Sequence, residues 1–163
     1  MLFRSLLNEA VAELSGQRRT VARPVRADVR VDAYVPAAYI GSEALKIDLH
    51  RRLALTEDED ELRELRAGVE DRYGELPDPV DNLFAIQEAK LKIARIGAEY
   101  LVFRGGRLTV GQMILGSSEL RELRERVPTA VYTSAKHEVT LREGDFRQAL
   151  GLVDAILEAR QAA

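Results

Sequence analysis

The 163-residue chain contains no cysteine. This absence excludes disulfides, thiolate metal sites and cysteine nucleophiles, and it fits a reducing compartment. No apolar run approaches the about 20 residues that a membrane-spanning helix needs. The N-terminal residues have the pattern of an amphipathic helix and not that of a signal peptide. We therefore expect a cytoplasmic localisation and no membrane partner.

Histidine is scarce, and His50 and His137 are its only occurrences. The two lie far apart and fit no zinc-binding spacing such as H-E-x-x-H. We expect His50 to be partly buried with its hydrogen bonds satisfied, and His137 to be a surface residue. The chain also lacks the G-x-x-x-x-G-K-[ST] loop that cradles nucleotide phosphates. An enzyme acting alone is therefore disfavoured, and we expect no catalytic residue, metal or cofactor.

Positive charge does not predominate, because the net charge is −3 with 31% of residues charged. That balance argues against a nucleic-acid binder that works through bulk charge. The cations are 20 arginines and only 4 lysines, a bias typical of protein interfaces but also of GC-rich genomes. An alternative function is a nucleic-acid-binding accessory module that uses the basic segment 17–30, with Arg18, Arg19, Arg23 and Arg26.

The length predicts one domain with an N-terminal appendage. Residues 1–16 have the apolar spacing of a helix, and residues 17–24 are typical of a linker. In the remaining domain, residues 25–160, strict alternation of apolar and polar residues predicts a strand over 25–35. Helices are expected at 42–54, 80–97, 115–127 and from 146, and short strands at 100–103, 107–110, 130–133 and 138–141. The fold class is therefore α+β, with a mixed or antiparallel sheet of about four or five strands and several flanking helices.

Two of these helices carry specific burial expectations. The helix at 42–54, with Ser42 as its N-cap, has leucines on one side and Ile47 on another, which predicts burial around much of its circumference. The helix at 80–97 is expected to turn Phe84 and Ala94 inward and to end near Gly97.

A further amphipathic segment, from Thr56 to Tyr73, has the most informative pattern. Its apolar residues Leu62, Leu65, Val69 and Tyr73 follow helical spacing and predict a buried stripe. Thr56 with Glu59 has capping-box spacing at the start of this helix, and Gly74 is expected to end it.

Acidic residues lie opposite that stripe. At about 100° per residue, Asp71 is almost diametrically opposed to the apolar positions, with Glu57, Asp60 and Glu64 near the same azimuth. The helix is thus predicted to expose an acidic ridge. From the residues alone, a solvated face and a binding surface are equally good interpretations of this ridge.

Three motifs resemble a known family. They are Asp32-Ala33-Tyr34-Val35-Pro36 with Tyr39-Ile40, Leu49-His50-Arg51-Arg52-Leu53-Ala54, and Asp71-Arg72-Tyr73-Gly74-Glu75-Leu76-Pro77-Asp78-Pro79-Val80. In order and spacing, residues 25–101 resemble the C-terminal domain of the bacterial transcription-repair coupling factor. The opening Leu6-Leu7-Asn8-Glu9-Ala10-Val11 is similar to the last helix of that family's translocase module.

The resemblance implies a regulatory and non-catalytic domain of an ATP-dependent DNA translocase. In the family, this domain docks on the N-terminal UvrB-like module of the same polypeptide. Docking masks the surface that binds the damage-recognition protein UvrA until the motor engages a stalled RNA polymerase. UvrA and RNA polymerase would thus be indirect partners, and no direct contact with nucleic acid is expected.

The family's docking helix usually reads E-L-x-D-R-[FY]-G. Asp71 and Arg72 match this motif, but Gly68 stands where the family has its leading glutamate. Glu64, one turn earlier, or Glu70 is a candidate to compensate. The resemblance therefore implies a partner-binding set of Asp71 and Arg72, with Glu64 in support and Gly68 as the departure.

Overall fold

The computed structural model describes residues 24–162, which form an α+β fold around a five-stranded mixed sheet. The strands are β1 (Arg26–Val29), β2 (Tyr100–Arg104), β3 (Arg107–Gly111), β4 (Val131–Thr133) and β5 (Glu138–Arg142). The helices are α2 (Glu43–Leu55), α3 (Glu59–Tyr73), α4 (Asp78–Ile96), α5 (Ser117–Arg126), α6 (Phe146–Ala149) and α7 (Gly151–Ala162). The expected fold class is confirmed. The predicted helix 1–16 and all of the predicted linker except Pro24 lie outside the described residues.

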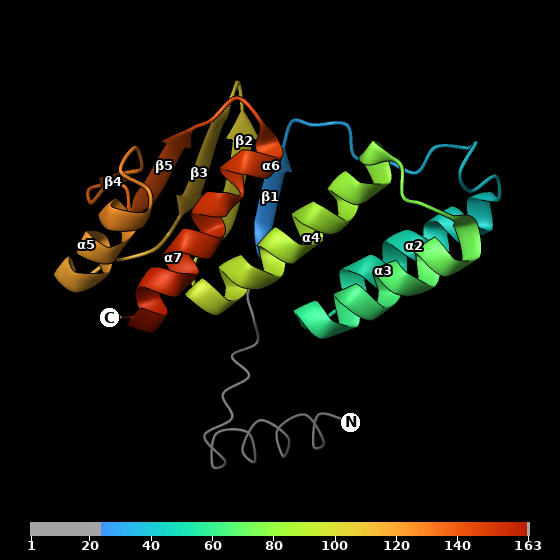
Figure 1. Ribbon diagram of the computed structural model, residues 1–163, viewed down its shortest axis with the longest axis horizontal. Coiled ribbons are helices and arrows are strands. Elements are labelled where there is room, and N and C mark those ends of the chain that lie inside the picture. Colours follow the sequence, from blue (N-terminus) through green and yellow to red (C-terminus); the bar gives the residue numbers. More distant parts are fainter. Residues whose placement is uncertain (1–23, 163) are drawn as a thin grey trace, which may run out of the picture.

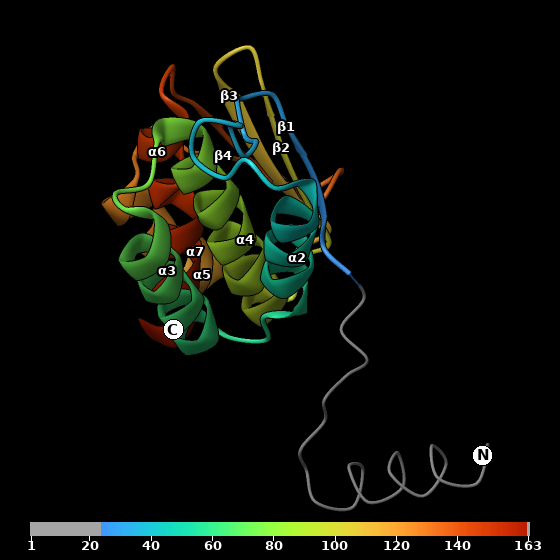
Figure 2. The ribbon, with the colours of Figure 1, turned by 90° about the vertical axis from the view of Figure 1, so that its right-hand side faces the viewer.

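The sheet has the strand order β1-β2-β3-β5-β4. β1 pairs with β2 in parallel, and the other neighbours are antiparallel. Gly105 and Gly106 connect β2 and β3 at φ angles of 57° and 72°, as expected for a tight hairpin turn. Helices α5, α6 and α7 lie in front of the sheet in Figure 1. In the turned view of Figure 2, strands β1 and β2 lie on the opposite side of the molecule from α6.

The first strand is shorter than predicted, because β1 ends at Val29 and not at Val35. Beyond it, the N–H of Arg30 still donates to the carbonyl of Phe103, and the chain then leaves the sheet. Val31 packs against the sheet core, whereas Val35 is buried among the helices α2, α3 and α4. The alternation of apolar and polar residues over 25–35 therefore reflects an extended segment that connects two cores. Any extended chain turns successive side chains to opposite sides, whether or not it pairs in a sheet.

Helix α4 lies between those two cores. Val80 and Phe84 are buried in the helical core with α2 and α3. On its other side, Ala85, Ala89, Ile93 and Ile96 are buried in the core formed by the sheet with α5, α6 and α7. The predicted inward position of Ala94 is wrong, because this residue is exposed near the C-terminal end of α4.

Helix α2 has the predicted N-cap, since the side chain of Ser42 accepts a hydrogen bond from the N–H of Leu45. The expected burial of much of its circumference is wrong. Ile47 is 66% exposed, because only one side of α2 packs against α3 and α4. His50 is also exposed and not partly buried, whereas His137 lies on the surface as expected.

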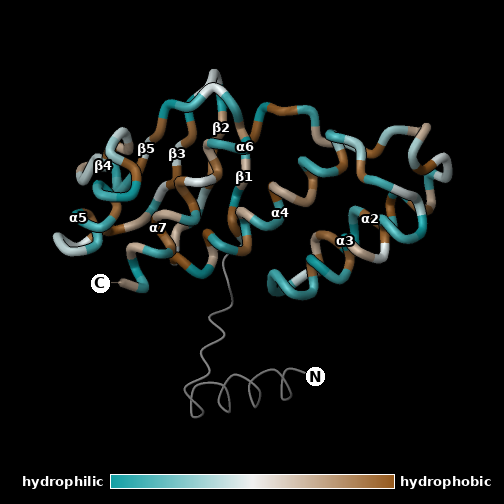
Figure 3. The backbone as a smooth tube through the Cα atoms, viewed as in Figure 1, coloured by the Kyte–Doolittle hydropathy of each residue, from teal (hydrophilic) through white to brown (hydrophobic). Residues whose placement is uncertain are grey.

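Helix α3 begins later than predicted. Thr56 belongs to the end of α2, where both its N–H and its hydroxyl donate to the carbonyl of Leu53. Asp58 caps α3 instead, and its carboxylate accepts a 2.8 Å hydrogen bond from the N–H of Glu61. The buried stripe of α3 is confirmed, and hydrophobic and hydrophilic residues alternate along this helix in Figure 3.

Tyr100 crosses the neighbouring strand over a glycine. Its register partner on β3 is Gly111, and a Cβ atom built on Gly111 would lie 1.8 Å from the Cζ of Tyr100. The Tyr100 hydroxyl donates a 2.5 Å hydrogen bond to Glu138 on β5. A glycine on the middle strand therefore lets one side chain connect three strands.

Gly111→Ala should destabilise the domain by about 1–3 kcal/mol, because the new methyl group displaces the Tyr100 ring. Urea unfolding measures the change. The matched control is Gly144→Ala, since a Cβ on Gly144 has no heavy atom within 4 Å. Equal stability of the two variants would contradict this interpretation.

A pH effect is expected from the same tyrosine. Burial, followed by the hydrogen bond and the charge of Glu138, raises the pKa of Tyr100 from 10 to about 12. The folded state thus retains this proton between pH 10 and 12 while the unfolded state loses it, so the stabilisation is complete below pH 10 and is lost as pH rises toward 12. The stability difference between the wild type and Tyr100→Phe should shrink over that range in urea unfolding. A constant difference would show that the phenol titrates normally.

Candidate functional site

The structure places the predicted partner-binding residues on one exposed face of α3. Glu64, Gly68, Asp71 and Arg72 are all exposed, and their spacing covers an arc of about 100° on a helix. Within residues 24–162, neither Glu64 nor Asp71 forms an ion pair or a side-chain hydrogen bond. Their charges therefore remain available to a binding partner.

The acidic ridge is shorter than predicted. Glu57 precedes the helix and does not share its azimuth, because α3 starts only at Glu59. Asp60 forms a 2.7 Å ion pair with Arg63 on the solvent side. The ridge is therefore a surface of mixed charge, in which Glu64 and Asp71 are the unpaired carboxylates.

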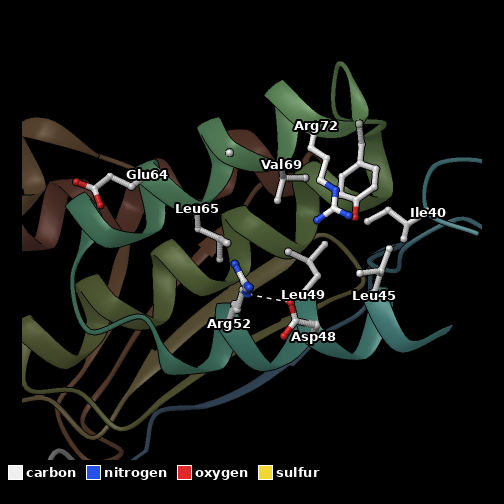
Figure 4. Close-up of a pocket in the computed structure, with 11 residues that line it drawn as sticks. Ile40, Leu45, Asp48, Leu49, Arg52, Glu64, Leu65, Val69 and Arg72 are labelled. Atoms are coloured by element: carbon white, nitrogen blue, oxygen red, sulfur yellow. Dashed lines mark ion pairs between the residues drawn. The ribbon is translucent and has the colours of Figure 1, made fainter. Parts of the chain in front are cut away.

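An open groove runs beside this face, between α2 and α3. It has a volume of about 220 Å³, and Figure 4 shows its lining. Its apolar part comes from the loop before α2 and from both helices: Ile40, Leu45, Leu49, Leu65 and Val69. Glu64, Gly68 and Arg72 line it from α3, whereas Asp71 does not. Of the four predicted partner-binding residues, three thus line the groove, and Asp71 lies on the outer face of α3.

The opposite wall of the groove carries residues that the sequence interpretation did not identify. Arg52 of α2 forms a 2.9 Å ion pair with Asp48, one turn earlier. Their i,i+4 spacing was a visible signal of the pair. Nothing in the sequence indicated that this side of α2 faces α3, because that depends on how the two helices pack.

Glu70 is already engaged within the domain. Arg66 contacts Glu70 at 3.1 Å and Asp81 of α4 at 2.6 Å. Burial lowers the pKa of Arg66, but Asp81 and Glu70 outweigh this effect, and the pKa is raised overall. Of the two candidates to compensate for Gly68, only Glu64 remains unpaired in the described residues.

The C-terminal end of α3 is held by an aromatic pair. The Tyr39 hydroxyl donates a 2.7 Å hydrogen bond to the carbonyl of Gly74, and its ring lies 5.8 Å from that of Tyr73. Burial, followed by the charge of Glu70, raises the pKa of Tyr39, which favours the protonated form of the hydroxyl that donates this hydrogen bond. Gly74 has a φ of 90°, which favours glycine. Asp71 and Arg72 therefore project from an anchored helix end.

Arg72 stands at the boundary between the face and the groove. Its guanidinium lies 5.2 Å from the centroid of the Tyr73 ring, within the range of a cation–π contact. In Figure 4 it lies at the same end of the groove as Ile40, and Glu64 lies near the other end. An apolar groove with charges at both ends is suited to binding another protein.

The described residues contain no group of histidine, cysteine or carboxylate side chains arranged to hold a metal ion. No helix of the described part of the chain is long and apolar enough to cross a membrane.

Gly68→Ala should stabilise the domain by about 0.5–1 kcal/mol, because glycine weakens an exposed helix interior. The substitution is sterically free, since a Cβ on Gly68 meets no heavy atom within 4 Å. Thermal unfolding followed by circular dichroism measures the gain. Gly74→Ala is the contrasting variant, because its positive φ should make the same change destabilising. Loss of stability in Gly68→Ala would mean that the glycine is structurally required.

Comparisons with known proteins match this chain to one family. The TRCF domain family matches residues 29–113, which is more than half of the chain. The chain is 31% identical over 96 residues to the transcription-repair-coupling factor of Helicobacter pylori, covering 59% of this chain and 10% of that protein. With the Staphylococcus epidermidis factor it is 32% identical over 106 residues, covering 64% of this chain and 9% of the relative. The chain thus spans about a tenth of the length of these relatives.

A solved structure has the same fold. The crystal structure of the C-terminal domain of transcription-repair coupling factor matches with a TM-score of 0.71. The match covers 88% of this chain and 99% of that one, at 19% sequence identity.

Proposed function

Since the chain belongs to the transcription-repair coupling factor family and has the fold of its C-terminal domain, we propose that it is a non-catalytic regulatory domain. It docks through the exposed face of α3 on the N-terminal UvrB-like module of its own polypeptide. Docking covers the UvrA-binding surface of that module and restrains repair recruitment and the motor. The full-length parent is an ATP-dependent DNA translocase, and residues 1–16 belong by sequence to its motor module.

The unpaired carboxylate of Asp71 is the observation that carries this proposal. It is exposed, and it has no ionic partner within residues 24–162. Asp71 is also one of the positions that match the family's docking motif. A carboxylate that neither packs nor pairs contributes little to folding, so its place in the motif is best explained by an arginine on the partner.

The neighbouring residues have distinct roles in the docked state. Arg72 lies at the end of the apolar groove, and its planar guanidinium group pairs bidentately with a carboxylate on the partner. Glu64 supplies the acidic group one turn before Gly68, in place of the family's glutamate. The groove receives an apolar side chain of the partner, which excludes water from the ionic contacts and strengthens them.

Calorimetry of this chain with the N-terminal fragment of its own full-length protein tests the proposal. Asp71→Arg should weaken binding by about 30-fold or more, because removing one member of a desolvated pair costs about 2–5 kcal/mol. Addition of UvrA should compete with this chain for the fragment.

Glu125→Arg is the matched control, since this exposed residue of α5 undergoes the same charge reversal away from α3. It should bind as the wild type does. Both variants should keep the wild-type circular dichroism spectrum and melting temperature. Unchanged affinity of a folded Asp71→Arg variant would refute the role of this face in docking.

A further inference from the structure

The outer face of the sheet carries a row of arginines. Arg107 of β3 is the register partner of Arg142 on β5 and of Arg104 at the hairpin. Arg30 continues this row, because it follows Val29, the partner of Phe103, and its N–H bonds the Phe103 carbonyl. Residues that are directly opposite in a sheet share one face, and neighbouring strands are about 4.8 Å apart. The row therefore crosses β1, β2, β3 and β5 at one end of the sheet.

This face is open to solvent. All four arginines are exposed, and the side chains of Arg30 and Arg104 have exposed fractions of 66% and 61%. Helices α4, α5, α6 and α7 pack on the other face, where Phe103, Leu108 and Leu141 are buried. On the outer face of the edge strand β4, Val131 is 59% exposed.

Acidic side chains neutralise only one end of the row. Asp28 pairs with both Arg30 and Arg104. Within residues 24–162, Arg107 and Arg142 form no ion pair and no side-chain hydrogen bond, although they are directly opposite each other. Like charges in this position destabilise a sheet. Within the described residues, no ion pair or side-chain hydrogen bond compensates for this repulsion, a local conflict of the kind found at functional sites.

Hydroxyl groups surround the unpaired end. Arg107 and Arg142 line a shallow pocket of about 370 Å³ together with Thr129, Thr133 and Thr140. Val131 supplies its apolar wall. The polar lining consists of guanidinium and hydroxyl groups, which donate hydrogen bonds to an anion, and it contains no carboxylate.

We infer that the arginine row on the outer face of the sheet binds the phosphodiester backbone of a nucleic acid, with a phosphate group seated between Arg107 and Arg142. Guanidinium groups pair with phosphate bidentately, and threonine hydroxyls are common phosphate donors. The row of arginines is about three strand spacings long. An extended row of this kind is better suited to contacting successive phosphates of a nucleic-acid backbone than to enclosing a single small anion. No feature of the face reads base edges, so binding is independent of sequence.

This surface differs from both expectations drawn from the sequence. Of the described residues of the basic segment 17–30, Arg26 and Arg30 lie on it, and the rest of the row comes from residues 104–142. It is also separate from the α3 face, so the inference does not depend on the proposed docking function.

Fluorescence anisotropy of the 163-residue chain with a labelled 20-base-pair DNA duplex of arbitrary sequence, at 20–200 mM salt, tests this inference. The double variant Arg107→Gln/Arg142→Gln should bind about tenfold more weakly at low salt. Its plot of log affinity against log salt should be shallower by about 2, because two phosphate contacts are lost. The variant should melt no lower than the wild type, because its removed charges repel each other. Single-stranded DNA and RNA of equal length establish which backbone is preferred.

The matched control, Arg51→Gln/Arg121→Gln, removes the same charge from exposed helix positions and should change affinity less than twofold. Equal losses in the two double variants would overturn the inference, since binding would then follow net charge. A full loss in Arg18→Gln/Arg19→Gln, or no binding by the wild type at low salt, would also overturn it. Tighter binding of polyglutamate than of DNA would assign the face to an acidic protein instead.

Discussion

Helix α4 is the element on which both halves of this domain depend. Its Val80 and Phe84 close the helical core, and its Ala85, Ala89, Ile93 and Ile96 close the core against the sheet. A helix with two buried sides must satisfy two packing surfaces at once, and its small alanines permit close approach on the sheet side. The position of the α2–α3 pair relative to the sheet follows from this shared helix.

The exposed face of α3, which we propose as the docking surface, is held in place by contacts of α3 with α4. Arg66 connects α3 to Asp81 of α4, and Glu59 at the start of α3 pairs with Arg95 near the end of α4. The hydrogen bond from Tyr39 to Gly74 holds the remaining end. Ion pairs exposed to solvent contribute little individually, but together they fix the helix orientation. A preorganised face loses less entropy on binding than a flexible one.

The two proposed surfaces use charge in different ways. On α3, Glu64 lines an apolar groove and Asp71 lies on the outer face beside it, which suits one protein partner with a matching shape. On the sheet, Arg107 and Arg142 lie in an open face with hydroxyl groups, which suits a repeating anionic backbone. The net charge of −3 concealed this second feature, because a sum over the chain does not describe how charges are distributed.

Local patterns in the sequence were sufficient for most helices and strands. The Ser42 cap and the buried stripe of α3 were predicted correctly, because each depends on a few neighbouring residues. The alternation of apolar and polar residues through Val35 gave a wrong end for the first strand, because an unpaired extended chain and a paired strand have the same period of two. The Thr56 cap failed because Asp58 caps α3 while Thr56 bonds back to α2.

The sequence by itself determined the family motif, the exposure of Asp71, and the α+β class. Only the tertiary structure decided that α2 and α3 enclose a groove and that Arg30, Arg104, Arg107 and Arg142 form one row. Both depend on which segments pack or pair across long sequence separations. Local periodicity contains no information on such pairing, whereas strand register and helix packing define it directly.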